Sequence, residues 1–259
     1  MKTPLLPIQI ASIYKPSSGR RIYLPSRMAV CTPDTNSAIL GIKAEIESLG
    51  GQLYLSDLFR SYDMQFQANL DYTSGKKKAY SPPPGGSMHE GGRAFDIDLS
   101  AIGISLDKFW NIAAKFGVSP IISKPDPSMK EAWHFDCRGS HGLIYNYYAS
   151  GKGTNMKPYQ AMTASAILSA GLQHDMFRGK ERAACVQSML IRLGHDIGNI
   201  DGLIGRKTRS ALASIGVPEY NLEETIDALE DLVQLTFPDE FSIKETVMMA
   251  DMQPEYISG

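Results

Sequence analysis

The spacing of apolar residues predicts alternating helices and short strands in the first two thirds of the chain. Residues 34–50 carry apolar side chains every three or four positions and end in glycine, which predicts an amphipathic helix capped by an Asp or Thr, with Ile39, Ile42, Ile46 and Leu49 on its apolar face. Residues 51–59 favour a short strand, and residues 74–87 are polar, Gly- and Pro-rich loop. Further helices are predicted over residues 60–72, 106–117, 141–150 and 161–171.

Two segments alternate with the period of a β-strand, in which successive side chains point to opposite faces. Residues 94–100 would bury their aromatic and aliphatic side chains and place Asp96 on the other face. Residues 133–137 would do the same with His134, and residues 118–123 predict a third strand. Polar groups of two strands are therefore expected on faces that point away from the core.

The last third of the chain predicts a small helical unit from about Phe177 to Phe237. Residues 181–194 and 206–216 have helical patterns separated by a turn-rich loop. Asn221 with Glu224 forms a capping box for a third helix. The apolar stripes on these helices are expected to form one core, so this unit is interpreted as a second domain.

Composition and charge restrict the class of protein. The chain has 259 residues, 43% of them hydrophobic, which is typical of a globular protein with a substantial core. A formal net charge of −2 lacks the basic surplus of nucleic-acid-binding proteins, so no nucleic-acid partner is expected. Three widely spaced cysteines exclude a disulfide framework and a sulfur-ligated zinc site.

The N-terminal stretch lacks the features of a secretory signal. Its apolar part is short and interrupted by Pro4 and Pro7, and no apolar run approaches the roughly 18 residues of a membrane span. We expect a monomer made in the cytoplasm that, if it works outside, is delivered by release or injection.

Histidines and carboxylates between residues 89 and 134 have the spacing of a metal site. A catalytic zinc needs three ligands from His or carboxylate and an open position for water. His89, Asp96 and His134 would supply the ligands, and Glu131, in the turn before the second strand, would remain as the base. The segment HEGGR is not the HExxH helix of other zinc proteases, because its fifth residue is Arg93 and a Gly-Gly pair disfavours a helix. The predicted chemistry is metal-assisted amide hydrolysis.

The same residues fit the motif of a known family. Residues 87–96 match S-x-H-x-x-G-x-A-x-D, and residues 131–134 match E-x-x-H. Residues 30–150 therefore resemble the LAS-type zinc peptidases, which include D-Ala-D-Ala carboxypeptidases, dipeptidases and phage L-alanyl-D-glutamate endolysins. The resemblance implies zinc bound by His89, Asp96 and His134, with Glu131 as general base and then acid.

The resemblance also implies residues that contact the substrate. The family has an arginine after its first core strand that stabilises the tetrahedral intermediate, and Arg60 occupies that place, with Ser61 and Gln65 nearby. Ser87 matches the motif serine that helps to bind the peptide. The remaining histidines, His141, His174 and His195, are interpreted as structural, and Asp98 and Asp136 as solvated or as supports of the ligands.

A second resemblance covers residues 182–215. The Leu-Gly helix end, the I-D-G-x-x-G loop and the T-R-x-A-L helix are similar to the three-helix peptidoglycan-binding module. The aromatic-Gln pair that usually follows the second helix of that module is missing. The similarity thus implies the fold of the module more directly than its binding of the wall.

These observations predict an α+β catalytic domain, with a small mainly antiparallel sheet and flanking helices, followed by an all-α domain. Residues 1–170 would form the first domain, with its core at 30–150, and residues 171–259 the second, with its core at 177–237. The predicted function is zinc-dependent hydrolysis of an amide bond in the stem peptide or cross-link of peptidoglycan, as in an endolysin-like or injected lytic enzyme. The alternatives are an exported D-Ala-D-Ala carboxypeptidase and a non-catalytic peptidoglycan-binding or tail protein.

Overall fold

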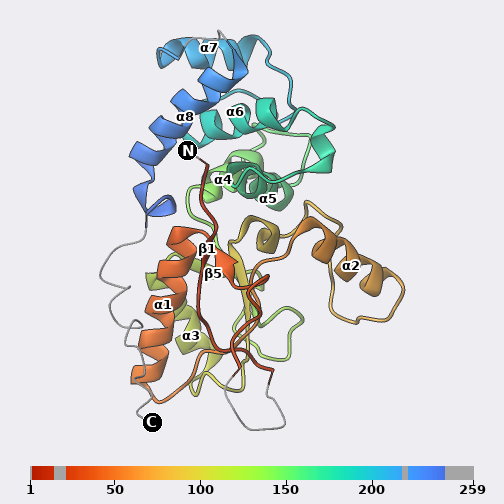
Figure 1. Cartoon of the computed structure of the whole chain (residues 1–259), viewed down its shortest axis with the longest axis vertical. Coiled ribbons are helices and arrows are strands. Elements are labelled where there is room, and N and C mark those ends of the chain that lie inside the picture. Colours follow the sequence, from red (N-terminus) through yellow and green to blue (C-terminus); the bar gives the residue numbers. More distant parts are fainter. Residues whose placement is uncertain (1, 15–21, 218–220, 243–259) are drawn as a thin grey trace, which may run out of the picture.

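A four-stranded antiparallel sheet organises the first half of the molecule in the computed structural model, which describes residues 2–14, 22–217 and 221–242 (Figure 1). The strand order is β3-β4-β6-β5, with bounds Leu55–Asp57, Ala94–Ile97, His134–Cys137 and Val118–Pro120. A separate two-stranded ribbon pairs β1 (Leu6–Pro7) with β2 (Val30–Cys31). This arrangement confirms the predicted α+β class for the sheet-bearing half.

The register between β4 and β6 sets which side chains share a face. Phe95 lies opposite Phe135, and Asp96 lies opposite His134. The two phenylalanines are fully buried, and Phe109 of α3 packs edge-on against Phe135 with ring centroids 4.8 Å apart. One face of the sheet is therefore the hydrophobic core, and the other carries the polar side chains, as the alternation predicts.

Three helices form close to their predicted positions: α1 (Pro33–Ser48), α2 (Tyr62–Thr73) and α3 (Leu106–Lys115). Helices α1 and α3 contact the sheet, whereas α2 projects to one side of the molecule (Figure 1). Helix α1 starts with Thr32 as its N-cap, earlier than expected, because a proline suits the first helical turn. Ile39, Ile42 and Ile46 are fully buried, whereas Leu49 follows the helix and is 44% exposed, so its predicted place on the apolar face is wrong.

The chain after β6 is helical. Its elements are α4 (His141–Ala149), α5 (Pro158–Ser169), η2 (Asp175–Phe177), α6 (Glu181–Arg192), α7 (Arg206–Ser214), α8 (Leu222–Thr236) and η3 (Pro238–Glu240). Figure 1 shows α4 and α5 between the sheet and α6–α8. The Asn221 side chain accepts a hydrogen bond from the backbone of Glu224, as expected of the cap of α8. Among the described residues, no helix is both long and apolar enough to cross a membrane.

The helices share a second hydrophobic cluster, which extends from Ile144 to Phe241. It includes Ala161, Ala164 and Leu168 of α5 together with the apolar faces of α6 and α8. Helices α4 and α5 thus pack with residues on the far side of the proposed boundary at 170–171. That division stays a prediction, and residues 243–259 of the second domain lie outside the described residues.

Buried charges join the two hydrophobic clusters. The Arg93 guanidinium, which follows the HEGG sequence, donates to Asp34 of α1 at 2.7 and 2.8 Å. Glu240 of η3 pairs with Arg192 of α6, lies 3.6 Å from Arg93, and accepts from the Ser140 backbone at 2.6 Å. Because isolated buried charges are costly, each of these groups depends on its partners.

Loss of the Glu240 charge should destabilise the protein. The substitution Glu240→Gln leaves Arg93 and Arg192 with Asp34 as the remaining carboxylate of this group, and removing one partner of a buried ion pair typically costs about 3–5 kcal/mol. Urea denaturation would measure the loss. As a control, Glu45→Gln breaks the exposed Lys115–Glu45 pair and should cost at most about 1 kcal/mol. Equal effects of the two substitutions would refute the role of the buried group.

Candidate metal centre

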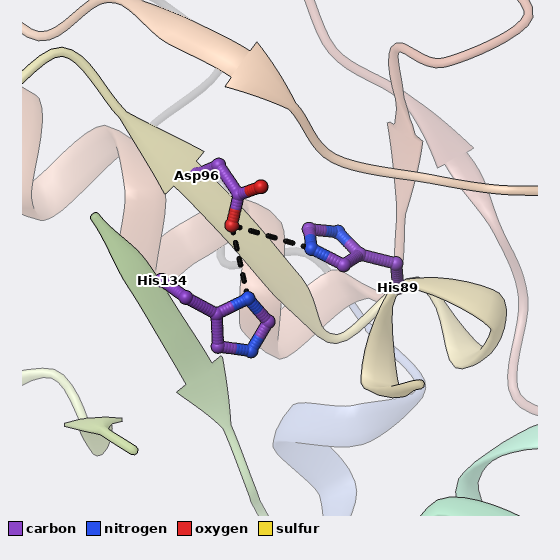
Figure 2. Close-up of side chains that lie close together, drawn as sticks. All are labelled: His89, Asp96 and His134. Carbon is purple, nitrogen blue, oxygen red and sulfur yellow. Dashed lines mark hydrogen bonds and ion pairs between the residues drawn. The ribbon is translucent and has the colours of Figure 1, made fainter. Parts of the chain in front are cut away.

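His89, Asp96 and His134 come together at the polar face of the sheet, although 45 positions separate the first from the last. His89 lies on the short helix η1 (Met88–Gly91), Asp96 on β4 and His134 on β6. Figure 2 shows both imidazoles directed at one oxygen of Asp96. The Asp96 Oδ1 atom is 2.9 Å from His134 Nδ1 and 3.3 Å from His89 Nε2, and the three ligand atoms lie within 4.8 Å of one another.

The local sequence explains the sharp turn that presents His89. Ser87 caps η1, and the Glu90 carboxylate accepts from the backbone of Gly85 and Ser87. Gly92 has a φ of +67°, which favours glycine. At Gly91 a Cβ atom would lie 2.8 Å from Cβ of Ala166, so only glycine lets η1 approach α5 this closely.

The surroundings of each imidazole indicate which of its nitrogens would bind a metal. His89 Nδ1 lies 2.6 Å from the carbonyl oxygen of Leu58, which can only accept, so Nδ1 carries the proton and Nε2 presents its lone pair. His134 has a carboxylate oxygen at each nitrogen, Asp136 Oδ1 at 3.0 Å from Nε2 and Asp96 Oδ1 at 2.9 Å from Nδ1, so a metal bound at Nδ1 would leave the Nε2 proton donated to Asp136. Metal-ligating histidines commonly donate their second N–H in this way.

The electrostatics of the cluster favour a cation. Burial opposes the charged form of His134, yet hydrogen bonds to Asp136 and Asp96 raise its pKa to about 10. Burial also opposes ionisation of Asp96, but His89 and His134 hold the pKa of that carboxyl well below its usual range. Since metal ligation requires deprotonated imidazoles, metal affinity should weaken as the pH falls.

The donor set fits a divalent metal. His89 Nε2 is buried and has no hydrogen-bond partner among the described residues, which is costly unless another group uses its lone pair. Neighbouring ligands of a tetrahedral zinc with bonds of 2.0–2.1 Å lie about 3.3–3.4 Å apart. Asp96 Oδ1 lies 3.3 Å from His89 Nε2 and 2.9 Å from His134 Nδ1, and all three atoms lie within 4.8 Å of one another, near enough to hold one ion. Two imidazoles and one carboxylate leave an open position, as in catalytic zinc sites.

Glu131 lies in the turn before β6, where its role as base was predicted, and it lines the cavity beside the cluster. Its φ of +65° is uncommon for a residue other than glycine, and such backbone conformations concentrate at functional sites. Its backbone carbonyl accepts from the His134 N–H at 3.0 Å. Burial, and next the charge of Asp96, raise the pKa of the Glu131 carboxyl, as suits a group that exchanges protons.

Arg60 is buried at the edge of the same cavity and is held by acidic neighbours. Its Nε donates to Asp57 at 2.6 Å, its Nη1 donates to Gln65 at 3.1 Å, and its Nη2 lies 3.6 Å from Asp96 Oδ2. The structure therefore places Arg60 against a candidate metal ligand as well as on the cavity wall.

The residues expected to bind substrate occupy different environments. Ser87 lines the cavity, and its hydroxyl caps η1. Ser61 and Gln65 are not among the described residues that line this cavity. The Ser61 hydroxyl caps α2. Fully buried Gln65 donates to Ser81 and to the Pro82 carbonyl and accepts from Arg60, so Gln65 supports the loop and the arginine.

The cavity has a volume of about 390 Å³ and receives walls from parts of the chain far apart in sequence. The Pro-rich loop at residues 82–86 forms one wall, and Lys157 at the start of α5 contributes to another. His174 also lines the cavity, and its Nε2 lies 3.2 Å from the Gly85 carbonyl oxygen. The sequence analysis interpreted His174 as structural and did not predict that it lines the cavity. The part of the chain beyond residue 150 thus helps to shape the site.

Two residues behind the candidate metal cluster, Asp136 and Tyr159, have contacts that the sequence analysis did not predict. Of the two roles predicted for Asp136, the structure agrees with that of a support of the candidate ligands, because Asp136 is fully buried, bonds to His134 and is covered by α5. The hydroxyl of Tyr159 on α5 donates to Asp136 Oδ1 at 3.1 Å. Burial, and next the charge of Asp136, raise the pKa of Tyr159, which keeps the hydroxyl a donor. Alternation in 133–137 could indicate Asp136, but no local signal connects Tyr159 to it.

Comparison with known proteins gives limited similarity. No model of a known protein family matches the chain, and no curated protein matches it. Among solved structures, that of the LdcB LD-carboxypeptidase, described in terms of peptidoglycan recognition, is similar with 21% sequence identity and a TM-score of 0.38. The similarity covers 51% of this chain and 66% of that chain, slightly less than two thirds of it.

The purified protein should bind one equivalent of a divalent transition metal. His89→Ala and His134→Ala each remove a ligand and should lose the metal, as measured by elemental analysis after dialysis. His195→Ala is the matched control, because His195 lies outside the cluster, and it should keep the metal. Full metal content in both ligand variants would exclude this site.

Proposed function

We propose that this chain is a zinc-dependent peptidase that hydrolyses an amide bond in the peptide part of peptidoglycan. The observation that carries the proposal is the convergence of His89 Nε2, Asp96 Oδ1 and His134 Nδ1 beside a cavity that Glu131 also lines. Nitrogen and carboxylate ligands with one open position suit zinc and hydrolytic chemistry. The S-x-H-x-x-G-x-A-x-D and E-x-x-H motifs, and their resemblance to LAS-type peptidases, support the substrate class.

The protein's own groups supply proton transfer and orientation. A zinc ion held by the three ligands would polarise the scissile carbonyl and lower the pKa of a bound water. The Glu131 carboxylate would accept a proton from the attacking water and deliver it to the leaving amine nitrogen. Its Oε1 is buried without a hydrogen-bond partner among the described residues, so this oxygen is available for the proton.

Arg60 and Ser87 are the candidate contacts to the substrate. Both line the cavity, and a guanidinium there would stabilise negative charge that develops on the carbonyl oxygen. Lys157, at the start of α5, also lines the cavity and adds a positive charge to its wall. These cations suit a peptide that carries carboxylates, as peptidoglycan stem peptides do.

Digestion of purified sacculi tests the reaction itself. Mass spectrometry of the released muropeptides should show products that differ from the substrate by one hydrolysed amide bond. Glu131→Gln should keep the metal and the fold but lower kcat by about 10²- to 10⁴-fold, the usual contribution of a positioned acid and base. Unchanged muropeptides with metal-loaded wild-type protein would refute the proposal, and an unchanged kcat in the variant would remove Glu131 from the mechanism.

Arg60→Ala separates two roles for the arginine. If Arg60 stabilises the carbonyl oxygen, kcat should fall by about 10²- to 10³-fold with the metal content unchanged. If Arg60 chiefly holds Asp96, from which its Nη2 lies 3.6 Å, metal content should fall together with activity. Measuring zinc stoichiometry and kcat on the same preparation distinguishes the two. Full activity of the Arg60→Ala variant would show that Arg60 neither stabilises the carbonyl oxygen nor holds Asp96.

A further inference from the structure

A chain of hydrogen bonds leads from the metal cluster to α5. His134 faces the cluster with Nδ1 and donates through Nε2 to Asp136 Oδ1 at 3.0 Å. The same Oδ1 atom accepts from the Tyr159 hydroxyl at 3.1 Å. The other carboxylate oxygen of Asp136 is buried and has no hydrogen-bond partner among the described residues.

Asp136 therefore depends on two donors. It is fully buried, and a buried carboxylate needs hydrogen bonds to offset the loss of water. A carboxylate bonded through one oxygen can still rotate about its Cβ–Cγ bond, and a second donor on that oxygen restricts this rotation. The direction of Oδ1 in turn fixes the ring of His134, because the N–H to carboxylate bond is directional.

Packing holds Tyr159 in place. Tyr159 and Tyr145 pack against a small apolar cluster of Met88, Ala94, Met162 and Ala166, which joins η1, β4 and α5. The same helix approaches η1 closely at Gly91, two residues after His89. One face of α5 is thus in contact with the elements that carry all three candidate ligands.

We propose that Tyr159 is a positioning residue of the metal centre, which orients the ligand His134 through Asp136. The inference rests on the proposed metal site, and it extends that site to a helix outside the motif-bearing region. Loss of the Tyr159 hydroxyl should let the His134 imidazole change its orientation more freely, and this should weaken metal binding without removing a ligand.

The test is zinc affinity, measured by competition with a chromophoric chelator. Removal of groups that support metal ligands typically lowers metal affinity 10- to 100-fold, so the effect of Asp136→Ala should fall in that range. Tyr159 is one hydrogen bond further from the candidate metal than Asp136, so Tyr159→Phe should weaken zinc binding by about 3- to 10-fold. The rate of zinc transfer from loaded protein to excess chelator should rise in parallel. This second measurement needs no stable metal-free protein.

Tyr147→Phe is the matched control. The Tyr147 hydroxyl donates to Asp196 at 3.0 Å and accepts from the Gly198 backbone at 2.8 Å, so this variant also loses hydrogen bonds, but none that lead to the cluster. It should change stability and leave zinc affinity unchanged. Circular dichroism would establish that both phenylalanine variants are folded.

A double-mutant cycle shows whether Tyr159 acts through Asp136. In the Asp136→Ala background, Tyr159→Phe should change zinc affinity by less than about twofold, because the link is already broken. Additive effects, or wild-type affinity in Tyr159→Phe, would overturn the inference while the proposed function stands. Absence of zinc binding by the wild-type protein would overturn the metal site and this inference with it, whereas zinc binding without hydrolysis would refute the proposed function alone.

Discussion

The pairing of Asp96 with His134 across β4 and β6 is the constraint on which the site depends. Directly opposed residues of antiparallel strands place their side chains on the same face, a few ångströms apart. The next pair along, Phe95 with Phe135, then points into the core. A shift of one residue in register would turn one of these two polar side chains toward the hydrophobic core and a phenylalanine toward the face that carries the cluster. The hydrophobic core therefore holds these two candidate ligands in register.

The third ligand depends on a different kind of contact. His89 belongs to a short helix that has no strand partner, and its position follows from the Leu58 carbonyl on one side and α5 on the other. Two glycines of the HEGG sequence make this position of His89 possible. Gly92 adopts a left-handed backbone conformation, and Gly91 has no side chain that would collide with Ala166. Gly92, a fixed position of the motif, and Gly91, a variable one, are thus both structural requirements of the site.

The helices after residue 140 are connected to the site by polar as well as apolar contacts. Arg93, which directly follows the motif glycines, lies in the same buried group of charges as Glu240 and Arg192. Tyr159 and His174 reach the back of the cluster and the wall of the cavity, respectively. The sheet-bearing half and the helical half of the described chain therefore share buried polar and apolar contacts.

The sequence by itself determined the helices α1 to α3 and the alternation of the strands, and it indicated His89, Asp96, His134 and Glu131 as the candidate site, because these follow from local periodicity and from the chemistry of residue types at short spacing. Only the tertiary structure decided what covers the polar face of the sheet. The burial of Asp136, the contact of Tyr159 with it, and the supporting positions of Ser61 and Gln65 depend on packing between segments far apart in the chain. Periodicity shows which side of an element is polar, but the partner that packs on that side is set by the fold as a whole.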